Sequence, residues 1–231
     1  MTISWSVYFI LIVKEVVVDD FEHVLDKLGK KYGSDKSSSG HDYLKTYDRL
    51  FVPWRHKEIT LLEIGVFNGA SITCWEEYFS KAKIVGVDID PKTKSFERGR
   101  VKIENIDQSN VEDLARIALE YGPFDIIIDD GSHYWNHQIT SLIYLFPFLK
   151  SGGFYVIEDL QTNFGRLAAE YRGVANESCM AYLKKWADLL VGHEESGIEF
   201  IDDPFLRTYG REIYYISFFR HMAVINKKNR G

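Results

Sequence analysis

Short apolar runs alternate with longer stretches of helical spacing from residue 60 onward, and this alternation limits the fold more than any other feature of the sequence. The runs are continuously apolar, as in strands that are buried on both faces, and parallel sheets covered by helices are built from such strands. The sequence therefore predicts an α/β fold with a mostly parallel sheet and helices on both faces. The expected strands are 60–66, 83–89, 125–129 and 154–157, and the expected helices between them are 71–79, 111–120 and 135–149.

Two further helices are expected before the first strand. Asp19 or Asp20 would cap the first helix, and Gly29 offers a stop for it. The second, at 43–51, carries aromatic and apolar residues at helical spacing and is limited by Pro53, because the residue before a proline disfavours helical backbone.

The end of the sequence indicates a closing β-hairpin made of 213–218 and 222–226. The chain has 231 residues with 45% hydrophobic and 27% charged composition, which suits a single α/β domain with a sizeable core. We expect an N-terminal extension with entry helices at 1–52 and a Rossmann-like core at 53–231. A mostly helical stretch at 164–195 is expected to act as a lid over the site.

Charge and cysteine content exclude some functions and favour others. The formal net charge of −6 argues against nucleic-acid binding, which usually needs a basic surface. Cys74 and Cys179 form neither a disulfide framework nor a metal-binding pair, so a reducing, cytoplasmic setting is expected. The apolar run at 3–13 is shorter than the roughly 20 residues that span a bilayer. We expect it to pack on the body or on a second subunit of a homo-oligomer, with an interfacial membrane contact as the less favoured alternative.

The segment 63–69 lies where the first expected strand meets its helix. Gly65 and Gly69 let the backbone turn tightly and approach a ligand closely, although they do not complete a dinucleotide fingerprint. Asp88 ends the second strand, where a carboxylate commonly accepts hydrogen bonds from ribose hydroxyls. Asp107 and Gln108 follow a further probable strand between 83–89 and the helix 111–120, where they would contact an adenine, and an Asx turn is an equally good interpretation.

Acidic residues follow two later strands, with Asp130 after 125–129 and Glu158 and Asp159 after 154–157. The carboxyl ends of strands in a parallel sheet line one crevice, so these carboxylates are expected to converge. A divalent cation would relieve their repulsion, and oxygen ligands favour Mg²⁺ or Mn²⁺ over Zn²⁺. Helix capping and a solvated rim are the alternative interpretation.

His133 follows the first acidic cluster and is placed to act as a general base near neutral pH. A structural hydrogen bond at the start of a helix is the alternative. His137, one helical turn later, is expected on the substrate side or in a supporting position, outside the catalytic set.

Taken together, these motifs resemble class I methyltransferases of the macrolide-sugar type, a family that includes the mycinamicin and macrocin O-methyltransferases and is related to proteins labelled cephalosporin hydroxylase. The resemblance runs from about Leu28 to the end of the chain. The motifs that carry it are Tyr32-Gly33-Ser34-Asp35-Lys36, Tyr43 with Tyr47, Glu63-Ile64-Gly65-Val66-Phe67-Asn68-Gly69, Asp107-Gln108-Ser109, Asp129-Asp130-Gly131-Ser132-His133 and Ile157-Glu158-Asp159.

The resemblance implies a mostly parallel seven-stranded sheet with a C-terminal hairpin, S-adenosylmethionine as methyl donor, and Mg²⁺ held by Asp130, Glu158 and Asp159. It also implies that His133 is the base and that the metal holds neighbouring sugar hydroxyls. The residues expected to bind the methyl donor are Glu63, Gly65, Asn68, Gly69, Asp88, Asp107, Gln108 and Asp130. The substrate-side candidates are Tyr32, Lys36, Tyr43 and His137.

The expected function is metal-assisted O-methylation of a sugar in a nucleotide sugar, glycan or glycosylated natural product. A catechol-type methyltransferase is an alternative, because a vicinal aromatic diol would chelate the metal equally well. From other classes, a non-haem iron oxygenase would need two histidines and one carboxylate on the metal, and a non-catalytic S-adenosylmethionine-binding module would need no base. Aromatic residues between Phe164 and Trp186 either stack on a sugar or belong to the core, and helical spacing favours the core.

Overall fold

The computed structural model describes residues 22–192 and 202–229. The apolar run at 3–13, the expected caps Asp19 and Asp20 and the last three residues of the expected lid, 193–195, lie outside the described residues. Within the described ranges, no helix is both long enough and apolar enough to cross a membrane.

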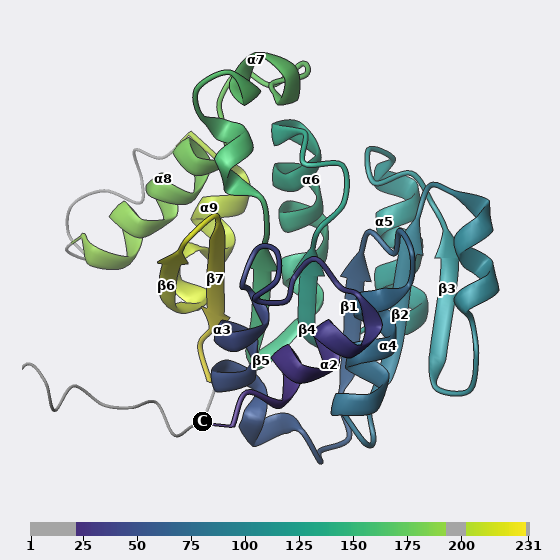
Figure 1. Ribbon diagram of the computed structural model, residues 1–231. Coiled ribbons are helices and arrows are strands. Elements are labelled where there is room, and N and C mark those ends of the chain that lie inside the picture. Colours follow the sequence, from purple (N-terminus) through teal and green to yellow (C-terminus); the bar gives the residue numbers. More distant parts are fainter. Residues whose placement is uncertain (1–21, 193–201, 230–231) are drawn as a thin grey trace, which may run out of the picture.

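One seven-stranded sheet organises the described chain (Figure 1), in the order β3-β2-β1-β4-β5-β7-β6. The first five strands pair in parallel, whereas β7 is antiparallel to both of its neighbours. The predicted mostly parallel sheet with a closing hairpin is therefore confirmed. The strands are β1 Thr60–Ile64, β2 Lys83–Asp88, β3 Val101–Asn105, β4 Phe124–Asp129, β5 Leu149–Ile157, β6 Ile213–Phe219 and β7 Met222–Lys227.

Helices cover both faces of the sheet, because successive strand residues point to opposite sides. On β1, Leu61 packs into the core formed with α2, α3 and α4, whereas Leu62 and Ile64 pack into the core formed with α5, α6 and α8. The described α-helices are α2 Val24–Tyr32, α3 Leu44–Phe51, α4 Ala70–Tyr78, α5 Val111–Tyr121, α6 Trp135–Leu145, α7 Leu167–Tyr171, α8 Cys179–Val191 and α9 Pro204–Tyr209.

The predicted stop of the entry helix at Gly29 is wrong. Helix α2 runs through Gly29 and ends at Gly33, whose left-handed backbone (φ 72°) lets its N–H bond to the carbonyl of Gly29. Gly29 serves packing instead, because a Cβ there would collide with the side chain of Leu44 at the start of α3. Glycine at position 29 is therefore explained by the close approach of two helices, which the residue pattern of one helix cannot reveal.

The boundary between α6 and β5 also differs from the prediction. Helix α6 ends at Leu145, and a short 3₁₀ helix, Phe146–Phe148, leads into a strand that begins at Leu149. Pro147 lies in this turn, where its missing N–H costs no α-helical hydrogen bond. The second entry helix, expected at 43–51 and limited by Pro53, is confirmed as α3, which ends at Phe51 and passes into the 3₁₀ helix Val52–Trp54.

Candidate active site

The loop between β1 and α4 approaches the end of β4 as closely as a glycine allows. Gly65 has φ 92°, and a Cβ at this position would collide with the carbonyl oxygen of Asp130. The backbone of Asp130 also donates a 2.9 Å hydrogen bond to Ile64. Gly69 has φ 73° and precedes α4. The two glycines therefore bring this loop against the residues at the end of β4.

Asp88 holds the glycine loop in place from the end of β2. Its Oδ2 accepts hydrogen bonds from the backbone N–H groups of Val66 (2.8 Å) and Phe67 (2.9 Å), and its Oδ1 accepts one from Asp90. Phe67 is held at φ 50° with its side chain 81% exposed. The structure thus brings Asp88 to the expected loop, and contact with a ribose stays a prediction.

Asp107 and Gln108 play different parts. Oδ1 of Asp107 accepts from the backbone of Ser109 at 2.8 Å and from its hydroxyl, which is the Asx turn considered above. Gln108 is buried, donates to Asp129 (2.8 Å) and to Ser141 (3.0 Å), and accepts from the N–H of Ser132 (2.9 Å). Gln108 therefore anchors the loop that carries His133, and adenine contact by either residue stays a prediction.

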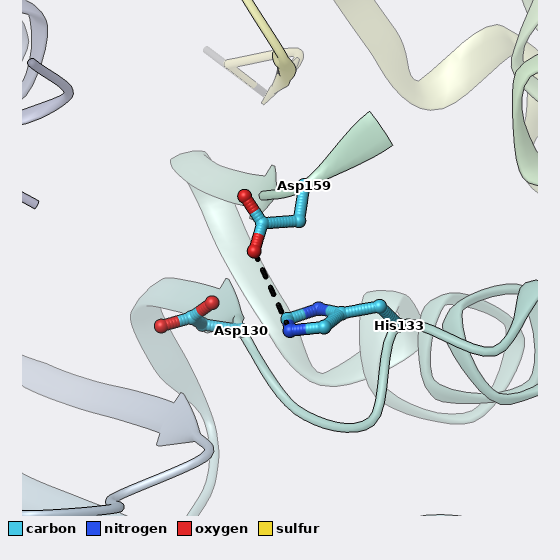
Figure 2. Close-up of side chains that lie close together, drawn as sticks. All are labelled: Asp130, His133 and Asp159. Carbon is cyan, nitrogen blue, oxygen red and sulfur yellow. Dashed lines mark ion pairs between the residues drawn. The ribbon is translucent and has the colours of Figure 1, made fainter. Parts of the chain in front are cut away.

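Three potential metal ligands gather at the ends of β4 and β5. Asp130, His133 and Asp159 each offer an atom within 4.8 Å of the others (Figure 2). Nε2 of His133 lies 3.4 Å from Oδ2 of Asp159. His133 and Asp159 both have left-handed backbone, with φ 60° and 56°, and this strain is characteristic of functional sites. The two carboxylates fit a hard divalent cation that keeps water or substrate ligands, and the imidazole, 22% exposed, lies beside them where a base is needed.

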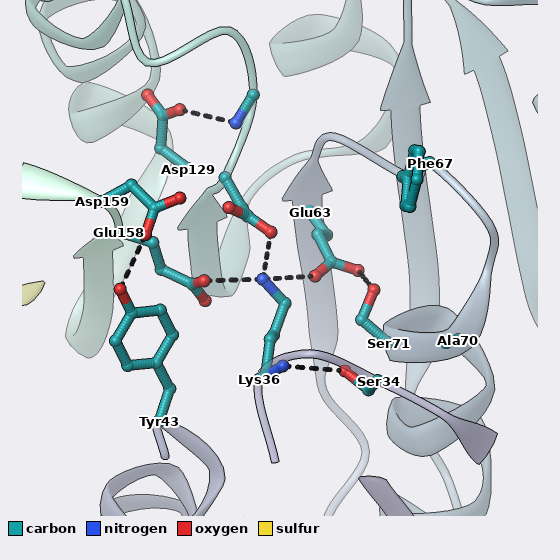
Figure 3. Close-up of polar contacts among 12 residues, drawn as sticks. Ser34, Lys36, Tyr43, Glu63, Phe67, Ala70, Ser71, Asp129, Glu158 and Asp159 are labelled. Carbon is teal, nitrogen blue, oxygen red and sulfur yellow. Dashed lines mark hydrogen bonds and ion pairs between the residues drawn. The ribbon is translucent and has the colours of Figure 1, made fainter. Parts of the chain in front are cut away.

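Glu158 faces inward from the same strand end. Its Oε2 lies 2.6 Å from Nζ of Lys36 (Figure 3). Its Oε1 accepts a hydrogen bond from Tyr47. Lys36 also contacts Asp130 and lies 3.8 Å from Glu63. Glu158 is therefore not one of the three gathered ligands, and its predicted role on the metal stays a prediction.

Burial and charge set the ionisation of this cluster. Burial opposes the charge of Lys36, but Asp130, Glu158 and Glu63 together raise its pKa well above the ordinary value. Burial raises the pKa of Glu63 to about 7, with Lys36, Ser71 and Trp75 acting in the opposite direction. The side chain of Glu63 accepts from Ser71 and Trp75 at 2.9 and 3.1 Å. It is fully buried and is not among the residues that line the cavity, so contact with the methyl donor stays a prediction.

Asp159 is stabilised in its ionised form although its side chain is only 16% exposed. Burial tends to raise its pKa, but hydrogen bonds from Tyr43 (2.7 Å) and Gln161 (3.1 Å), together with His133, lower it below the usual value. A carboxylate that stays charged is the form that binds a cation.

Of the remaining substrate-side candidates, His137 bonds through Nδ1 to the hydroxyl of Ser132 (2.7 Å), and burial lowers its pKa. The structure does not bring Tyr32 to the cavity, because its hydroxyl bonds to Glu77 on α4.

Tyr47 was expected only to pack in a helix core and to support the family resemblance. Its bond to Glu158 had no separate signal in the sequence, since helical spacing does not reveal where a hydroxyl points.

A cavity of about 220 Å³ joins these parts. One wall is the glycine loop, another is the segment 34–36, and the third is the metal-ligand group. The lining residues are Ser34, Asp35, Lys36, Gly65, Val66, Phe67, Asn68, Ser71, Asp130, Gly131, His133 and Asp159.

The expected lid divides into two parts with different surroundings. Tyr182 and Trp186 of α8 are buried in the core beside α6 and do not face the cavity. In contrast, Tyr171 of α7 lies next to His133, with ring centroids 6.2 Å apart, and also contacts Tyr134 at 5.8 Å. Figure 1 shows α7 above the end of α6. Closure of α7 over the site stays a prediction.

Comparison with solved structures identifies the fold. The chain is similar to the MycE methyltransferase of the mycinamycin biosynthetic pathway, solved in complex with Mg, SAH and mycinamycin VI, with TM-score 0.76 and 31% identity over 89% of this chain and 54% of that one. It is also similar to the SAH-bound methyltransferase PaMTH1 of Podospora anserina, with TM-score 0.52 and 18% identity over 99% and 98% of the two chains.

Comparison with curated proteins gives several O-methyltransferases among the relatives. The chain is 40% identical to mycinamicin VI 2''-O-methyltransferase of Micromonospora griseorubida and to demethylmacrocin O-methyltransferase of Streptomyces fradiae, over 61% of this chain and 37% of each relative. It is 39% identical to a rhamnosyl-tetracenomycin 3'-O-methyltransferase of Streptomyces olivaceus, over the same shares. The chain thus spans little more than a third of the length of these relatives. No family model matches it.

The sheet order, the glycine loop and the acidic strand ends define the class I methyltransferase fold, as the structural likeness confirms. Within this class the chain is similar to the macrolide-sugar O-methyltransferases over the part that it shares with those longer enzymes.

Proposed function

We propose that this chain is a divalent-cation-assisted O-methyltransferase that transfers the methyl group of S-adenosylmethionine to a sugar hydroxyl of a glycosylated small molecule. The observation that carries the proposal is the convergence of Asp130, His133 and Asp159 on the cavity that the glycine loop also lines. A methyl donor bound along the loop would thus lie beside a base and a cation site.

The residues divide the chemistry between them. Asp130 and Asp159 hold the cation, which when bound polarises the acceptor hydroxyl and orients it. Nε2 of His133 accepts the hydroxyl proton near neutral pH. The acceptor oxygen then forms its bond to the methyl carbon as the carbon–sulfur bond breaks, and S-adenosylhomocysteine leaves with the bonding pair on sulfur.

Aromatic side chains beside the base favour a ring-shaped acceptor. Tyr134 and Tyr171 lie next to His133, and neither belongs to the buried hydrophobic cores on the two faces of the sheet. Such faces bind the apolar side of a sugar or the ring of an aglycone. The named relatives act on rhamnosyl and macrolide sugars, and this supports a sugar over a free catechol.

The composition of the ligand group argues against an iron oxygenase. That chemistry uses two histidines and one carboxylate, whereas the gathered group holds one histidine and two carboxylates. The nearness of His133 to the cation ligands likewise favours catalysis over a module that only binds the methyl donor.

Calorimetric titration with S-adenosylhomocysteine, with and without Mg²⁺ and with NAD as a control, tests the first half of the proposal. We expect S-adenosylhomocysteine to bind and NAD not to bind. Incubation with labelled S-adenosylmethionine and parallel panels of glycosides and catechols then tests the acceptor. Absence of nucleoside binding in both conditions would overturn the methyltransferase proposal, and transfer to catechols alone would overturn the sugar acceptor.

A further inference from the structure

The buried ammonium group of Lys36 has no role in the proposed chemistry. Lys36 is 2% exposed, and its ammonium is surrounded by carboxylates from three strand ends (Figure 3). It contacts Asp130, lies 2.6 Å from Glu158 and lies 3.8 Å from Glu63. A lysine is almost never buried so completely unless it is paired, so its charge serves the carboxylates around it.

Neutral donors supply the other contacts of these carboxylates. Tyr47 donates to Glu158, and Ser71 and Trp75 donate to Glu63. Such hydrogen bonds satisfy lone pairs, but they do not balance negative charge in a buried setting. The Lys36 ammonium, 2.6 Å from Oε2 of Glu158, is the cationic group placed to balance this buried carboxylate.

Asp130 connects this inner group to the metal-ligand group. One of its oxygens, Oδ2, contacts Lys36, and the same side chain belongs to the set with His133 and Asp159. Its side chain is 23% exposed, whereas that of Glu158 is 1% exposed. Asp130 therefore lies between a permanent cation on its buried side and the place for a divalent cation on its open side.

We propose that Lys36 is a positioning residue that acts as an internal counter-ion. Its ammonium balances Glu158 and Asp130 before any divalent cation binds. This inference rests on the proposed function only where it concerns the divalent cation. The balance of charge inside the fold is a property of the chain alone.

If Lys36 is a counter-ion, its removal has two consequences that removal of a lysine that only fills space would not have. Removal of its charge leaves buried carboxylates uncompensated, so the fold loses stability in a way that neutralising Glu158 partly restores. Removal also makes the cavity more negative, so a divalent cation binds more tightly although the protein is less stable.

The first experiment compares thermal unfolding of wild type, Lys36→Met, Glu158→Gln and the double variant in EDTA at pH 8. Lys185→Met serves as the control, since this half-exposed lysine pairs with Glu177 far from the cavity. We expect Lys36→Met to melt well below wild type and the double variant to melt above Lys36→Met. Additive losses in the double variant would overturn the counter-ion, because they would mean that Lys36 only fills space.

The second experiment measures Mn²⁺ binding to the same proteins by calorimetry, below their melting temperatures and without methyl donor. We expect Lys36→Met to bind Mn²⁺ roughly fivefold or more tightly than wild type, and Lys185→Met to match wild type. Unchanged or weaker binding by Lys36→Met would contradict the inference. If no protein binds Mn²⁺, the cation part of the proposed function fails, and the unfolding experiment still decides the role of Lys36.

Discussion

Nε2 of His133 lies 3.4 Å from Oδ2 of Asp159, and both residues have left-handed backbone although neither is glycine. The two side chains come from different strand ends, β4 and β5, and meet at the rim of the cavity. Oδ1 of the same aspartate accepts from Tyr43, so one carboxylate links the segment before α3 to the expected base. The aspartate thus has a fixed orientation before a cation or acceptor arrives.

Asp159→Asn should reduce cation-dependent methyl transfer by on the order of 100-fold or more, because an amide is a poor ligand for a hard cation. Asparagine tolerates left-handed backbone, so the fold should be retained. Affinity for S-adenosylhomocysteine, measured by calorimetry, should change little because Asp159 lies on a different wall of the cavity from the glycine loop. Unchanged turnover would remove Asp159 from the cation site.

His133→Asn should lower the rate roughly 10²- to 10⁴-fold at neutral pH, the usual contribution of a general base. The loss should be smaller at high pH, where more acceptor is already deprotonated. A pH–rate profile measures this, with His56→Asn as control, since His56 bonds to Ser80 away from the cavity. An equal loss at every pH would argue against the base.

Gly65→Ala should destabilise the fold far more than Gly33→Ala. Both glycines have positive φ, but only at position 65 would the added methyl group meet backbone, the carbonyl of Asp130. Gly33→Ala should cost about 1–2 kcal/mol for backbone strain alone. Gly65→Ala should exceed this by about 1–3 kcal/mol because of overpacking. Denaturant unfolding provides both values, and equal losses would mean that the loop has room to move.

Glu63 should make stability depend on pH. Its pKa of about 7 in the folded state lies above the ordinary value of 4.5, so the folded state keeps a proton that the unfolded state releases between these values. Wild type should therefore lose stability relative to Glu63→Gln as pH rises from about 4.5 to 7, by up to on the order of 3 kcal/mol, and no further above that range. Denaturant unfolding in EDTA across this range measures the difference, and parallel curves would contradict the prediction.

Tyr171→Ala should weaken acceptor binding rather than the chemical step. Loss of an aromatic face beside His133 should raise KM for a glycoside acceptor roughly fivefold to tenfold and leave kcat within a factor of about two. Tyr214→Ala, at an exposed position on β6, is the control. A fall in kcat at unchanged KM would place Tyr171 in support of His133 instead.

The helices, the strands and the residues at the carboxyl ends of the parallel strands could be predicted from local sequence patterns. Apolar runs and helical spacing are local patterns, so the parallel strands and the hairpin could be predicted, and parallel topology then put Asp130 and Asp159 on one edge. Gly65 was identifiable for the same reason, since a sharp turn between strand and helix is specified by the few residues that make it.

The contacts and hydrogen bonds between these side chains could be seen only in the tertiary structure. Lys36 lies 94 residues from Asp130 and 122 from Glu158 in the chain, and no periodicity reveals that its ammonium is buried between them. Gln108 likewise anchors a loop, and Gly29 marks a helix contact instead of a helix end. Burial and charge balance depend on packing of distant segments, whereas strand and helix patterns depend on neighbours along the chain.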